Sequence, residues 1–115
     1  KFMKNLLLAR HAKSSWNMEG LRDHDRPLND RGERDAPRMG AALRQRGVKP
    51  DAIYTSTALR AKTTAEVVAE ELSYSRSQIV TDREIYLADP RKLRSVIQRF
   101  NEDADTVMVF GIDNS

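Results

Sequence analysis

The stretch "LLLARHAKSSWN", from Leu6 to Asn17, decides the fold. Its short, uninterrupted apolar run is typical of a β-strand that is buried on both faces of a sheet. The run ends at Arg10 and His11, and small polar residues follow. In sheets of parallel strands, ligands bind beyond the carboxyl ends of the strands. Arg10 and His11 therefore stand where this kind of sheet places its chemistry.

Apolar segments that predict strands alternate with segments that predict helices along the rest of the chain. Further strands are expected in "DAIYTS" (51–56), "QIV" (78–80) and "TVMVF" (106–110). A helix is expected to begin at Asp30, since Glu33 follows three residues later as in a capping box. Pro37 is expected to kink the first turn or to separate it from the rest of the helix, and Gly47 is expected to end the helix.

Two more helices follow the second and third predicted strands. Ser56 or Thr57 is expected to cap the first of them, which buries a face of alanine, valine and leucine side chains. Asp89 followed by Pro90 predicts the start of the second, with Val96 on its buried side. This alternation indicates an α/β fold. We expect one domain over residues 1–115, a three-layer α/β/α sandwich with a mainly parallel central sheet.

The composition narrows the class of protein. The chain has 115 residues, of which 39% are hydrophobic and 32% charged, as in a soluble globular domain. It has no cysteine, which excludes disulfides and thiolate nucleophiles. The net charge is +3, but acidic residues alternate with the basic ones, so we expect no nucleic-acid partner. The apolar runs are too short for a signal peptide or a membrane span, and we expect a cytoplasmic protein without a membrane partner.

A second arginine is predicted near the first pair. Arg60, in "TSTALRAKTTAE", falls in the first turn of the helix that follows the second strand, where free N–H groups favour anions. Two guanidinium groups and an imidazole at neighbouring strand ends suit a phosphoryl group. A guanidinium group can donate two parallel hydrogen bonds to two oxygens of a phosphoryl group, and imidazole can act as a nucleophile.

The same residues carry a family resemblance. "RHAKSSWN" resembles the "RHG-x-T-x-x-N" signature of the histidine phosphatase (phosphoglycerate-mutase-like) superfamily. "RPLNDRGERDA" and "TSTALRAKTTAE" resemble its next two motifs, in the same order and at suitable spacing. The resemblance covers about Met3 to Gly111. Alanine at position 12 and the small size are most similar to the SixA-type phosphohistidine phosphatases.

The resemblance implies a role for each residue of the site. His11 would accept the phosphoryl group as a phosphohistidine intermediate, while Arg10 and Arg60 would bind its oxygens. Asn17 and Ser14 would add hydrogen bonds to the substrate, although Asn17 could equally be a turn residue that bonds its own backbone. No metal or other cofactor is implied, because the arginines take the place of a divalent ion.

The proton donor for the leaving group is less well defined. The resemblance places an acid between the arginine motif and the last strand, and Glu84 in "DREIYLADP" is the nearest candidate. The alternative is that Glu84 is simply an exposed carboxylate at a strand end. Asp82 is a poorer candidate. SixA-type enzymes are expected to need such an acid less, since a phosphorylated imidazole is already a good leaving group.

The sequence departs from the family in one place. A second histidine follows the last core strand in the family, whereas this chain has Ile112 after Gly111. Isoleucine cannot donate a hydrogen bond. We expect that the C-terminal part of the domain, with an "HNPG"-type segment after Gly111, is missing from this sequence. This explanation is favoured over a true replacement of the second histidine by Ile112. The other histidine, His24, is expected to be an exposed loop residue.

We therefore expect a metal-independent phosphatase that transfers a phosphoryl group to His11 and then to water. Its expected partner is a protein phosphorylated on histidine, or a small phosphomonoester. Two alternatives remain open. One is a mutase or small-molecule phosphatase of the same fold, and the other is an inactive phosphate-binding module, which a genuine Ile112 would favour.

Overall fold

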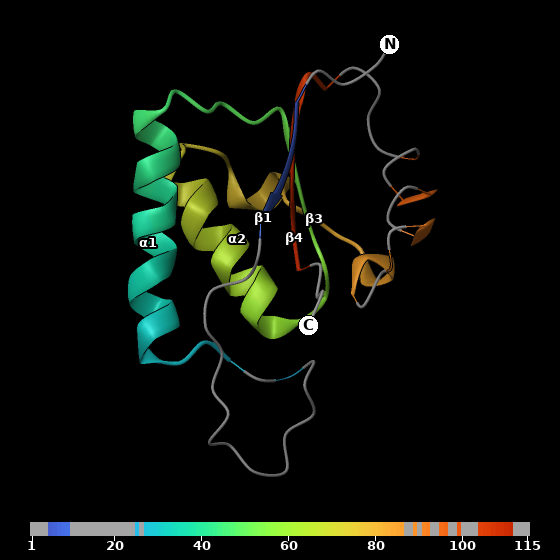
Figure 1. The fold of residues 1–115 in the computed structure, drawn as a ribbon, viewed down its shortest axis with the longest axis horizontal. Helices are drawn as coiled ribbons and strands as arrows, with labels where there is room; N and C mark the ends of the chain where they lie inside the picture. The colour runs from blue at the N-terminus through green and yellow to red at the C-terminus, as the bar shows by residue number, and fades with distance from the viewer. Residues whose placement is uncertain are drawn as a thin grey trace.

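The central sheet has four parallel strands in the order β1-β4-β2-β3 (Figure 1). The computed structural model describes residues 5–9, 25, 27–86, 89, 91–92, 95–96, 99 and 104–111. In these ranges the elements are β1 (Asn5–Ala9), α1 (Asp30–Gln45), β2 (Ala52–Thr55), α2 (Leu59–Glu71), the 3₁₀ helix η2 (Arg76–Gln78), β3 (Val80–Thr81), the 3₁₀ helix η3 (Arg83–Ile85) and β4 (Thr106–Phe110). The predicted α/β fold with a parallel sheet is confirmed.

The sheet lies between two apolar layers. On one face, side chains of β2 and β4 pack against α2, and α1 packs on α2 (Figure 1). This cluster contains Ile53, Ala65, Val68, Ala69, Met108 and Phe110. The opposite face carries a second cluster, made of Ala52, Tyr54, Ile85, Val96, Ala104, Val107 and Val109. Alternate residues of β2 and β4 thus point to opposite faces, as strands require, and both faces are covered.

The first strand is less buried than its apolar sequence predicts. β1 lies at the edge of the sheet and pairs with β4, from Asn5 opposite Thr106 to Ala9 opposite Phe110. Leu7 packs on the α2 side, but Leu6 and Leu8 are 38% and 54% exposed. The expectation of burial on both faces was therefore wrong for these two leucines. Periodicity indicates the strand but does not give its place in the sheet.

Two expectations for α1 also need correction. The helix begins at Asp30 as expected, but its N-cap is Asn29, one residue before the predicted capping box, and Asn29 Oδ1 accepts a hydrogen bond from the Gly32 N–H at 2.9 Å. The helix runs without interruption through Pro37. Proline removes one backbone hydrogen bond, but Ala36 and Gly40 on the buried side hold the two halves against the interior. Gly47, with φ +76°, follows the helix as predicted.

The third strand lies further along the chain than predicted. Gln78 ends η2, and β3 consists only of Val80 and Thr81, with Val80 opposite Tyr54 of β2. Asp89 accepts a hydrogen bond from the Lys92 N–H at 2.8 Å, as expected of a helix cap, and Val96 is buried. Among the described residues, neither α1 nor α2 combines the length and the apolar character needed to cross a membrane.

Candidate functional site at the carboxyl edge of the sheet

Three neighbouring strands end in one row at the carboxyl edge of the sheet. Ala9 in β1 is opposite Phe110 in β4, and Phe110 is opposite Thr55 in β2. Backbone hydrogen bonds continue the row: the Ser56 N–H donates to the Phe110 carbonyl at 3.0 Å, and the Asp82 N–H donates to the Thr55 carbonyl at 2.8 Å. Residues that follow these strands therefore begin from the same edge.

Arg60 occupies the first turn of α2 at this edge, as predicted. It is 2% exposed, and no acidic residue lies in that turn. The expected cap by Ser56 or Thr57 was wrong: the N-cap is Ala58, which makes no side-chain capping hydrogen bond. A cation at a helix N-terminus is unfavourable by itself because the end of the helix dipole is also positive. Arg60 and the helix end together make this edge attractive to an anion.

Ser56 and Gly111 form a second part of the edge that sequence reasoning missed. Ser56 is 0% exposed, and its Oγ has no hydrogen-bond partner among the described residues. Gly111 has φ +93°, and a Cβ at this position would overlap Ser56 Oγ. The sequence held one signal, a serine directly after a buried strand and before an arginine-bearing helix, but the prediction treated it only as a cap.

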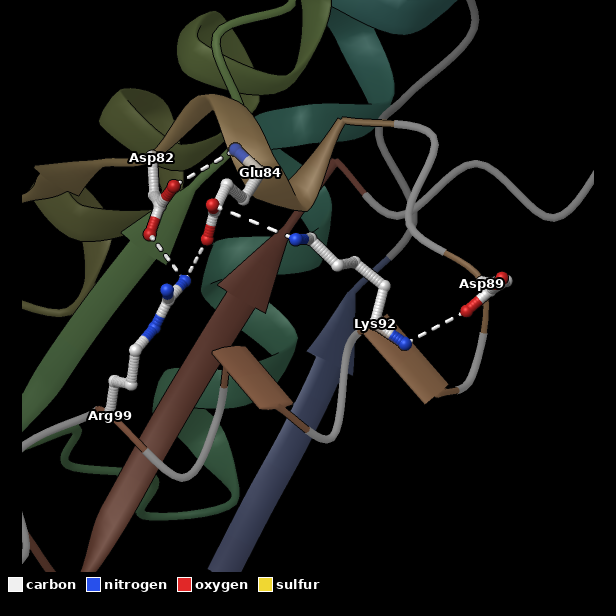
Figure 2. Close-up of polar contacts among 5 residues, drawn as sticks. All are labelled: Asp82, Glu84, Asp89, Lys92 and Arg99. Carbon is white, nitrogen blue, oxygen red and sulfur yellow. Dashed lines mark hydrogen bonds and ion pairs between the residues drawn. The ribbon is translucent and has the colours of Figure 1, made fainter.

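Glu84 lies in η3, two residues after Asp82, and is held by two cations (Figure 2). Arg99 donates to one carboxylate oxygen of Glu84, and Lys92 Nζ lies 3.6 Å from the other. Asp82 supports the arrangement because its Oδ1 accepts the Glu84 N–H at 2.9 Å. The carboxylate is thus bound in its ionised form.

This environment changes the acidity of Glu84. The hydrogen bond from Arg99 holds the pKa of Glu84 below its ordinary value of 4.5, and the charges of Arg99 and Lys92 act in the same direction. A general acid at neutral pH needs a pKa raised toward the working pH. In this arrangement Glu84 is ionised at neutral pH. It therefore pairs with cations and carries no proton to give to a leaving group.

The lowered pKa predicts a pH-dependent contribution to stability. A carboxylate with a pKa lower in the folded than in the unfolded chain stabilises the fold above its unfolded pKa, and the effect disappears as the pH falls through the folded pKa. We expect Glu84→Gln to lower the urea midpoint at pH 7, and expect the difference from the wild type to begin to decrease below about pH 4.5 and to disappear at the lower pKa of the folded chain. A difference that is equal at pH 7 and pH 3 would contradict the ion pairs.

The remaining predicted site residues are Arg10, His11, Ser14 and Asn17, and all four lie outside the described residues, as do His24 and Ile112. The structure places Arg60 and Glu84 at the same edge of the sheet, Arg60 after β2 and Glu84 after β3. It also adds Ser56 and Gly111 to that edge. In the described residues the site therefore consists of Arg60 at the start of α2, the buried hydroxyl of Ser56, and Gly111, which packs against that hydroxyl.

Known proteins share much of this sequence. Residues 6–106 match the model of the histidine phosphatase superfamily (branch 1). A 2,3-bisphosphoglycerate-dependent phosphoglycerate mutase from Thermobifida fusca is 42% identical over 71 residues, which cover 60% of this chain and 29% of the mutase. Phosphoglycerate mutase 1 from Saccharomyces cerevisiae is 30% identical over 108 residues, covering 88% of this chain and 44% of the mutase.

The fold is shared with solved structures. SixA from Agrobacterium tumefaciens superposes with a TM-score of 0.88 at 31% identity, covering 99% of this chain and 72% of that one. The protein histidine phosphatase SixA complexed with tungstate has a TM-score of 0.78 at 24% identity, and the match covers 92% of this chain. The chain spans less than half the length of the mutases named above. Its family model and its fold agree, and the chain belongs to the histidine phosphatase superfamily.

Proposed function

We propose that the protein is a metal-independent phosphatase that transfers a phosphoryl group to His11 and then to water. The observation that carries the proposal is Arg60, a buried guanidinium at the N-terminus of α2. A cation in that position is favourable when a phosphoryl group brings negative charge to it. The family match supports the same chemistry.

The nucleophile would follow β1, which lies on the other side of β4 from β2 and Arg60. His11 follows Ala9 by two residues, so covalent geometry limits its Cα to about 7 Å from that of Ala9. Nitrogen of the imidazole would attack phosphorus in line as the bond to the leaving group breaks, and water would then break the new P–N bond. Arg10 and Arg60 would bind the non-bridging oxygens, with Asn17 and Ser14 adding hydrogen bonds.

A phosphohistidine in a protein is the substrate we propose. SixA, whose name denotes a phosphohistidine phosphatase, is similar to this chain over 99% of its length. Phosphohistidine also suits the observed state of Glu84. Because imidazole is a good leaving group, its release does not require the proton that an ionised, doubly paired Glu84 is poorly placed to give.

The experiment compares two substrates in the presence of a chelator: a protein phosphorylated on histidine and an aryl phosphate. We expect the wild-type enzyme to turn over the phosphoprotein and His11→Ala to be inactive. With a ³²P-labelled substrate, the wild-type enzyme should also carry an acid-labile ³²P label. Activity that survives His11→Ala would refute the nucleophile. Phosphate binding without turnover would identify an inactive binding module, the alternative that Ile112 raises.

A phosphoglycerate mutase is the second candidate, because the curated relatives named above are mutases at 30–42% identity. The same preparation should therefore be given 3-phosphoglycerate with 2,3-bisphosphoglycerate. Mutase activity requires that the phosphoenzyme survive until the product has reoriented, so water must be kept out. Interconversion of the phosphoglycerates faster than release of inorganic phosphate would favour the mutase over the phosphatase.

The role of Glu84 as a proton donor can be tested through the leaving group. We expect Glu84→Gln to change phosphohistidine turnover less than threefold. If Glu84 gives a proton to poor leaving groups, the same variant should lose about 10²-fold or more on an alkyl phosphate. Asp89→Asn, which removes the charge from a helix cap in the same region, provides the control. Equal losses on both substrates would show that Glu84 acts through the structure and not as an acid.

A further inference from the structure

The Ser56 hydroxyl is buried without a hydrogen bond. The residue is 0% exposed, and its Oγ finds no partner among the described residues. Most buried polar groups in proteins are hydrogen-bonded, and one that is not costs stability. Alanine would fill nearly the same space without that cost. Such a hydroxyl needs an acceptor, which a bound molecule can supply.

The surrounding chain keeps space for this hydroxyl. A Cβ on Gly111 would overlap Ser56 Oγ and would lie 2.7 Å from Ser56 Cβ and 2.8 Å from Ala61 Cβ. Such approaches are closer than packed carbon atoms allow, so only glycine fits, and φ +93° favours glycine as well. Since one point lies beside both Ser56 Oγ and Ala61 Cβ, the hydroxyl is next to the first turn of α2.

We propose that Ser56 is a ligand of the phosphoryl group, a hydrogen-bond donor in the anion site formed by Arg60 and the N-terminus of α2. The inference rests on the proposed function and deepens it. A hydroxyl can donate one proton, and a phosphoryl oxygen is an acceptor only. The N–H groups of a helix start and a guanidinium are donors too, so the missing acceptor would come from the ligand.

This arrangement predicts opposite effects on binding and on stability. In Ser56→Ala the affinity for inorganic phosphate should fall about 10–100-fold, as for other hydrogen bonds to a charged group. The melting temperature without phosphate should stay the same or rise, because the variant loses a buried group that has no partner. A merely structural hydroxyl would show the reverse pattern, with lower stability and unchanged affinity.

Calorimetric titration with inorganic phosphate and with tungstate, combined with thermal melting of each variant without ligand, tests the proposal. Thr63→Ala is the matched control, because its hydroxyl donates to the Leu59 carbonyl at 2.9 Å within the same helix. We expect its affinity to equal that of the wild type. Unchanged affinity in Ser56→Ala would overturn the inference, and so would a loss of affinity accompanied by a lower melting temperature.

A third variant separates this inference from the proposed function. Arg60→Met should abolish measurable phosphate binding if the anion site exists. When Arg60→Met loses binding and Ser56→Ala does not, the phosphate site stands and only the role of Ser56 is refuted. When neither variant changes the affinity, the site at the α2 N-terminus is itself refuted.

Discussion

Arg60→Met is expected to lower kcat/KM for a phosphohistidine substrate by about 10²–10³-fold, the usual loss when one preorganised donor is removed from a transition state. Arg60 is 2% exposed and lies in the first turn of α2, directly after the loop that follows β2. Methionine keeps an unbranched apolar stem and removes the guanidinium.

Stability is measured beside activity, so that a loss of turnover is not mistaken for a loss of fold. The urea midpoint of each variant shows whether the domain is still folded under the conditions of the assay. Arg76→Met is the matched control. The Arg76 side chain is 62% exposed, and its guanidinium lies 3.2 Å from the carboxylate of Glu66 in α2, the helix that carries Arg60. Activity in Arg60→Met within threefold of the Arg76→Met value would exclude Arg60 from the site.

Phe110→Ala is expected to lower the free energy of unfolding by about 3–5 kcal/mol, the range measured when a buried phenylalanine is truncated. Phe110 is 0% exposed and packs with Ile53 and Met108 on the α2 face of the sheet. Small domains have a total stability of about 5–15 kcal/mol, so this loss would remove between about a fifth and all of that stability.

A leucine on the edge strand is the control for Phe110. Leu8 is 54% exposed, and Leu8→Ala should cost about 0.5 kcal/mol or less. Urea titration of both variants gives the comparison. A loss below 1 kcal/mol in Phe110→Ala would show that the cluster between the sheet and α2 is not packed as described.

The elements of the fold could be predicted from the sequence, but their environment could not. Strand and helix periodicities predicted β1, β2 and β4, as well as both long helices. The exposure of Leu6 and Leu8 depends on strand order, which a local pattern does not contain. The helix through Pro37 depends on tertiary packing that outweighs the loss of one hydrogen bond.

The charged residue of the site, Arg60, could be predicted from the sequence, whereas the small residues Ser56 and Gly111 were missed. Arg60 stands out because a cation at a helix start is unfavourable without an anion. Ser56 and Gly111 are common residues at strand ends, and they become informative only when the fold brings positions 56 and 111 together. The state of Glu84 was equally hidden, because Arg99 lies 15 residues away along the chain.

The pairing of β1 with β4 has a consequence for the order of folding. Asn5 is opposite Thr106, so this pairing closes a loop of about a hundred residues, whose entropy must be lost before any contact between the strands forms. Local contacts between α1 and α2 can form long before. We therefore expect β1 to dock later than the α1–α2 pair forms, after β4 has been synthesised. The strand that leads into His11 would then become ordered after α2, and a partly folded chain would have Arg60 without a nucleophile.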